Sequence, residues 1–104
     1  MKAYVAASSM LGFSLLAVAA LAHSPICDCF DNADGTVTCE GGFSDGGSAE
    51  GVSIRILDER DRVLIDGKMD GASSYSFDKP DTAFYVIFDA GQNHVVTIYG
   101  DDIE

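Results

Sequence analysis

Basic residues are scarce in this chain of 104 residues, which has 6 lysines and arginines against 17 aspartates and glutamates. The formal net charge is −11 at pH 7. A surface of this charge repels the phosphates of nucleic acids and anionic membrane headgroups, so we expect neither as a partner. Cations or basic proteins are favoured instead, although the acidic residues occur in ones and twos, as solvated turn residues do.

Catalytic motifs are also missing. The chain has only 2 histidines, and it contains no G-x-S-x-G nucleophile motif, no phosphate-binding loop and no H-E-x-x-H zinc motif. Its carboxylates are scattered, and a catalytic pair of carboxylates needs a cleft that so small a domain rarely has. We therefore expect a protein that is not an enzyme.

No long hydrophobic run follows residue 22, but residues 3–21 form one directly after the basic Lys2. This run is slightly shorter than the roughly 20 residues that span a bilayer. It ends in Ala-Leu-Ala, the A-x-A pattern that signal peptidase cleaves. We predict a signal peptide over residues 1–22, cleavage after Ala22 and a periplasmic or secreted protein without a membrane span; an uncleaved anchor is the alternative.

The three cysteines surround a β-hairpin signal. Residues 32–36, with the sequence NADGT, predict a three-residue loop made of a type I turn followed by a left-handed glycine. Counting outward from this turn places Cys29 opposite Cys39. Cys27 then lies on the same face, because side chains alternate along a strand.

These sulfurs have two interpretations. Opposed strand residues lie within disulfide range and exported proteins meet oxidising conditions, so a Cys29–Cys39 disulfide is predicted, with Cys27–Cys39 as the next pairing. Alternatively, Cys27, Cys29 and Cys39 bind a soft metal ion, completed by His23. Their spacing matches no zinc-finger pattern. An odd cysteine would be a reactive thiol, an intermolecular bridge or a ligand.

His23 would be the first residue of the chain after cleavage. There its α-amine and its imidazole can chelate one metal ion. Pro25 has no amide proton, so a square-planar site built on successive deprotonated amides is blocked. The alternative is a frayed and solvated terminus.

The rest of the chain alternates between short apolar strands and polar turns. Residues 23–43 hold the cysteine hairpin, residues 44–51 a glycine-rich connection, and residues 52–104 the remainder of a single domain. Strands are expected after the hairpin over residues 52–56, 63–69, 74–78, 84–88 and 94–99. About seven short strands without a helix predict an all-β fold, a small antiparallel β-sandwich whose strand aromatics lie in the core.

Several segments in this second part follow a known pattern: VSIRILD (52–58), RVL (62–64), GKMD (67–70), YSF (75–77) and YVIFDAG (85–91). They resemble the transthyretin-like, carboxypeptidase regulatory-like domains, which are immunoglobulin-like β-sandwiches. The sequence DAGQNH at residues 89–94 is similar to the Asp-Ala-Gly-x-Gly-His segment of small exported proteins associated with nickel and cobalt uptake, which also begin with His after their signal. Asn93 replaces the glycine before the final histidine, and the cysteine hairpin lies outside the pattern.

The resemblance implies an exported accessory protein that binds nickel or cobalt and whose partner is a membrane metal-uptake complex. Copper is a further candidate, because imidazole and thiolate ligands suit it as well. His23 would supply amine and imidazole, and His94 or the cysteines would complete the site. His94 is otherwise a surface or turn-bonded histidine, unless the fold brings it near His23. The competing hypothesis is a disulfide-stapled structural or interaction module without metal, which docks on another exported protein through a sheet edge or through Cys27.

Overall fold

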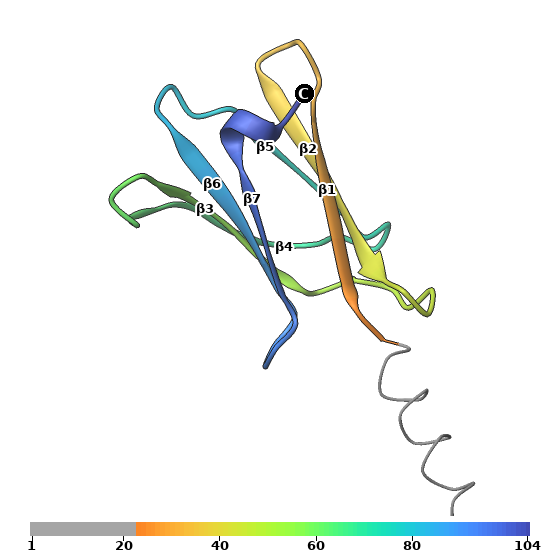
Figure 1. The fold of residues 1–104 in the computed structure, drawn as a ribbon. Coiled ribbons are helices and arrows are strands. Elements are labelled where there is room, and N and C mark those ends of the chain that lie inside the picture. Colours follow the sequence, from red (N-terminus) through yellow and green to blue (C-terminus); the bar gives the residue numbers. More distant parts are fainter. Residues whose placement is uncertain (1–22) are drawn as a thin grey trace, which may run out of the picture.

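The computed structural model describes residues 23–104, and the predicted signal peptide and its cleavage after Ala22 lie outside them. Seven strands form two antiparallel sheets (Figure 1). They are β1 (Pro25–Asp31), β2 (Thr36–Phe43), β3 (Ser53–Asp58), β4 (Val63–Lys68), β5 (Ser74–Asp78), β6 (Phe84–Asp89) and β7 (Val95–Tyr99). The prediction of a small all-β sandwich with about seven strands is confirmed.

The two sheets contain different parts of the chain. The cysteine hairpin β1–β2 pairs with β5 in a three-stranded sheet of order β1-β2-β5. The other sheet has the order β4-β3-β6-β7. At one side of the sandwich β1 lies beside β7, so the edge strands of the two sheets meet there (Figure 1). Across residues 23–104, no helix is long and apolar enough to cross a bilayer.

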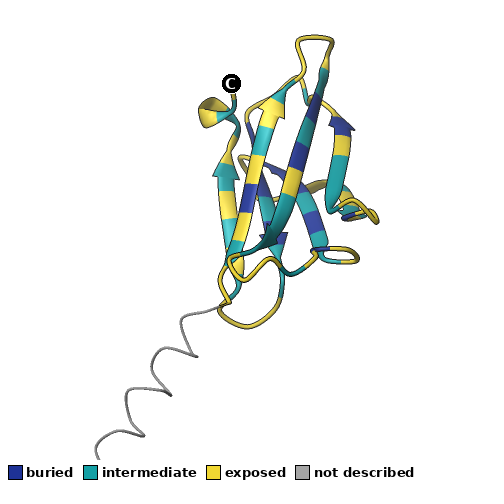
Figure 2. Cartoon of the chain, turned by 90° about the vertical axis from the view of Figure 1, so that its right-hand side faces the viewer, coloured by how far each residue is buried: buried dark blue, intermediate teal, exposed yellow. Residues whose placement is uncertain are grey.

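The core is formed by side chains that point inward from alternate positions along the strands. Inward positions are buried or half-buried and are generally less exposed than their outward neighbours, so the burial colours alternate along the strands in Figure 2. The fully buried side chains with the largest volumes are Phe88, Ile54, Ile56, Met69, Val37, Val86 and Cys39. Ala49 of the glycine-rich connection is also buried, and its N–H donates to Ser73 Oγ at 2.9 Å. This connection is therefore anchored to the core rather than a loose linker.

The expectation that the strand aromatics all lie in the core is wrong for the rings at outward positions, which are those of Phe30, Tyr85 and Tyr99. Phe77, Phe84 and Phe88 are buried, but Tyr99 is 59% exposed and Phe30 is 42% exposed. Both exposed rings occupy outward positions of edge strands, where alternation turns a side chain to solvent whatever its type. Periodicity alone did not distinguish the two faces.

The register of the cysteine hairpin is confirmed. Cys29 lies opposite Cys39, and Phe30 lies opposite Thr38, as the count from the turn predicts. The hairpin closes with a hydrogen bond from the Asn32 N–H to the Thr36 carbonyl.

The predicted turn type is wrong. Gly35 is left-handed with a φ of 93°, as expected, but Ala33 has a φ of 62°, whereas a type I turn needs about −60° there. Asp31 Oδ1 accepts the Ala33 N–H at 2.8 Å, and Asp34 Oδ1 accepts the Thr36 N–H at 3.0 Å. These two side-chain bonds hold the loop in a conformation that the residue types alone do not favour.

Candidate functional site

The fold brings the two histidines together. His23 lies two residues before β1 and His94 directly precedes β7, and these edge strands run side by side from the same end of the sandwich (Figure 1). The two imidazole centroids are 5.8 Å apart, with their planes at 60°. Because the two residues are far apart in sequence, only the packing of one sheet on the other creates this pair.

His23 is held by two neighbours. Its ring stacks on Phe43 at the end of β2, with centroids 4.3 Å apart and planes at 10°. Its Nδ1 lies 2.8 Å from Asp45 Oδ2. This hydrogen bond, with a second from the Gly47 N–H, lowers the pKa of the Asp45 carboxyl, so the acceptor is an ionised carboxylate at neutral pH. These two contacts hold the His23 side chain in place in this structure.

His94 is held by its own turn. Its Nδ1 lies 2.6 Å from the carbonyl oxygen of Gln92, and its main chain closes the turn through the His94 N–H to Gly91 bond. A carbonyl oxygen only accepts, so the proton of the neutral ring is on Nδ1. The same holds for His23, whose Nδ1 faces a carboxylate. Both rings therefore keep the lone pair of Nε2 for another partner.

The pair does not by itself complete a metal site. Among residues 23–104, no group of three or more His, Cys, Asp or Glu side chains is arranged to hold a metal ion. The two imidazoles can supply two ligands, with Asp45 and the Gln92 carbonyl as orienting acceptors.

The cysteines are engaged elsewhere. Cys29 and Cys39 form a disulfide, as predicted, and Cys27 is a free thiol that is only 7% exposed. Burial, together with the charge of Asp28, raises the pKa of Cys27 to about 12. With two sulfurs bonded and the third protonated, a three-thiolate metal site would require reduction of the disulfide first.

Comparison with models of known families, with curated proteins and with solved structures finds no match. The strand pairing establishes a small antiparallel sandwich compatible with an immunoglobulin-like fold. Membership in the transthyretin-like family stays a prediction.

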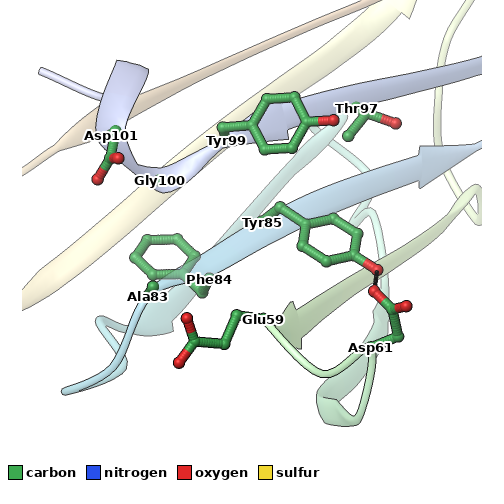
Figure 3. Close-up of a pocket in the computed structure, with 9 residues that line it drawn as sticks. All are labelled: Glu59, Asp61, Ala83, Phe84, Tyr85, Thr97, Tyr99, Gly100 and Asp101. Atoms are coloured by element: carbon green, nitrogen blue, oxygen red, sulfur yellow. Dashed lines mark hydrogen bonds between the residues drawn. The ribbon is translucent and has the colours of Figure 1, made fainter.

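The sequence did not predict a second candidate site. A pocket of about 490 Å³ lies on the outward face of β6 and β7, with Tyr85 and Tyr99 in it (Figure 3). The alternation within each strand did not mark this site, because it does not show which of the two faces points outward.

Proposed function

We propose that this protein is an exported, non-enzymatic accessory domain that binds a transition metal ion, nickel, cobalt or copper, through His23 and His94. The observation that supports this function best is the imidazole pair, 5.8 Å apart, in which an acceptor holds each Nδ1. Histidines that bind metals almost always donate their other ring N–H to a carboxylate or a backbone carbonyl in this way.

The geometry favours coordination by the two Nε2 atoms. Imidazole nitrogens lie about 2.0–2.1 Å from a bound ion, so two rings at this separation are close enough to share one. Nitrogen ligands of this kind suit nickel, cobalt and copper, and copper is expected to bind most tightly of the three. Water molecules complete the coordination shell.

The net negative charge of the protein and its predicted export both support metal binding. A formal charge of −11 concentrates cations around the protein and speeds their capture. Export would place the domain where incoming ions are first met, and a membrane metal-uptake complex would be the partner that receives them. The similarity of residues 89–94 to proteins of nickel and cobalt uptake supports this partner.

The test is calorimetric titration of the exported protein with Ni²⁺, Co²⁺ and Cu²⁺. We expect one ion per chain and a loss of about tenfold or more in affinity for His94→Ala and for Asp45→Asn, since even orienting partners contribute this much. Gln92→Ala is the matched control, because it keeps the carbonyl that holds His94. Equal uptake by the original protein and His94→Ala would overturn the proposal. An effect of His94→Ala without one of Asp45→Asn would instead indicate chelation by the α-amine and Nδ1 of His23.

The second candidate is an interaction module without metal. The Cys29–Cys39 disulfide and the exposed Val63 and Leu64 on the edge strand β4 favour it. An exposed strand edge can pair with a strand of another protein. Absence of metal uptake by the exported protein, with its disulfide intact, would make this the better answer.

A further inference from the structure

The tyrosine pocket lies apart from the histidines, on the outward face of the four-stranded sheet. Its volume is about 490 Å³, within the range of small-molecule sites. Tyr85 and Tyr99 are direct cross-strand partners, and their ring centroids are 6.1 Å apart with planes at 43° (Figure 3). The residues that line the pocket are Glu59, Asp61, Ala83, Phe84, Tyr85, Thr97, Tyr99, Gly100 and Asp101.

The two sides of the pocket are fixed by specific contacts. The Tyr85 hydroxyl donates to Asp61 Oδ1 at 2.6 Å, which ties its ring to the turn between β3 and β4 (Figure 3). On the other side, a Cβ on Gly100 would come within 2.9 Å of the Phe84 carbonyl oxygen. A glycine is therefore needed for the chain to turn closely over Phe84 and present Asp101 at the rim.

The lining combines negative charge with aromatic faces. Three carboxylates, those of Glu59, Asp61 and Asp101, surround it, and none of the described residues that line it is basic. In Figure 3, Glu59 and Asp61 lie on one side of the tyrosine rings and Asp101 lies on the other. Ammonium groups bind favourably both to carboxylates and over the faces of tyrosine rings.

The positions of these carboxylates favour an elongated ligand. Carboxylates on both sides of the tyrosine rings favour a ligand with a positive charge at each end over a compact cation. In a linear aliphatic diamine, the methylene groups between the charges would cover the exposed ring of Tyr99. We propose that the pocket binds a linear polyamine, with its ammonium groups at Glu59, Asp61 and Asp101 and its aliphatic stem across Tyr85 and Tyr99.

The first test is a titration with spermidine followed by amide chemical shifts of the exported protein. We expect saturable shifts centred on β6, β7 and the β3–β4 turn, and binding of butylamine about tenfold weaker, since it lacks the further ion pairs. An excess of Mg²⁺ should not displace spermidine. Shifts spread over the whole surface, or displacement by Mg²⁺, would overturn the proposal, because they indicate attraction to net charge alone. Tighter binding of a blocked two-lysine peptide would also overturn it in favour of a protein partner.

Variants locate the site without disturbing the core. Tyr99 is 59% exposed, so Tyr99→Leu should fold normally and weaken spermidine binding about threefold to fivefold, whereas Tyr99→Phe should keep most of it. Asp101→Asn should weaken binding about threefold. Glu40→Gln, on β2 of the other sheet, removes the same charge and should have no effect. Equal losses for Asp101→Asn and Glu40→Gln would contradict the assignment, and His94→Ala should leave spermidine binding unchanged.

Discussion

At the scale of single residues, Ala33 is a position where the residue type does not favour the backbone conformation. Its φ of 62° lies in the left-handed region, which costs an alanine about 1–2 kcal/mol. Glycine avoids this cost but loses more chain entropy on folding, about 0.4–1 kcal/mol. We expect Ala33→Gly to raise the free energy of unfolding by about 0.5–1 kcal/mol in urea denaturation, the difference of these terms.

The matched control for Ala33→Gly is Ala72→Gly. Ala72 is also exposed in a turn, but its φ is not positive. There the substitution should lower stability, since only the entropy term acts. Equal effects at the two positions would show that the backbone of Ala33 is not strained.

At the scale of elements, the cysteine hairpin was predictable because its information is local. Loop length fixes the register of a hairpin, and the register places Cys29 opposite Cys39. The strands were predictable for the same reason, because the alternation of apolar and polar residues lies within each segment. The turn conformation was not, because the bonds from Asp31 and Asp34 outweigh the preference of alanine.

The disulfide should contribute measurably to the stability of this hairpin. It joins residues 10 apart in sequence, and closing so short a loop in the unfolded chain corresponds to about 2–3 kcal/mol. We expect reductant to lower the urea midpoint accordingly, and the double variant Cys29→Ala/Cys39→Ala to lose this response. Cys27→Ala should keep it. If Cys27→Ala also abolished the response, the free and bonded cysteines would have to be reassigned.

At the scale of the whole molecule, both candidate sites depend on contacts that no local pattern carries. The histidine pair exists because β1 packs beside β7, and the tyrosine pair exists because Tyr85 is in register with Tyr99. Sequence identified His23 and His94 as candidate ligands but left their proximity open. The tyrosines were assigned to the core because aromatic residues usually lie there, and their outward positions follow only from the pairing.

Lowering the pH has two opposite effects on the stability of this acidic chain. Scattered carboxylates repel one another, so acidification relieves the folded state of its negative charge. Four aspartates instead stabilise it through hydrogen bonds that lower their pKa values: Asp31, Asp34, Asp45 and Asp58. Asp58 is buried and accepts the N–H groups of Arg60 and Arg62 and the Arg62 Nε–H.

In salt, we expect the loss of the aspartate hydrogen bonds at low pH to outweigh the relief of charge repulsion. Repulsion between distant surface charges is largely screened at 0.15 M, where the Debye length is about 8 Å. A carboxyl with a lowered folded pKa gives stability above its unfolded value near 3.9, and this stability is lost as the pH falls through the folded value. We therefore expect the urea midpoint to be steady from pH 7 to about 5 and to fall below about pH 4.

Asp58→Asn should lower the midpoint at pH 7, and its difference from the original protein should shrink below pH 4. Asp81→Asn, at an exposed site, should match the original throughout. A midpoint that rises below pH 4 in 0.15 M salt would show that charge repulsion dominates.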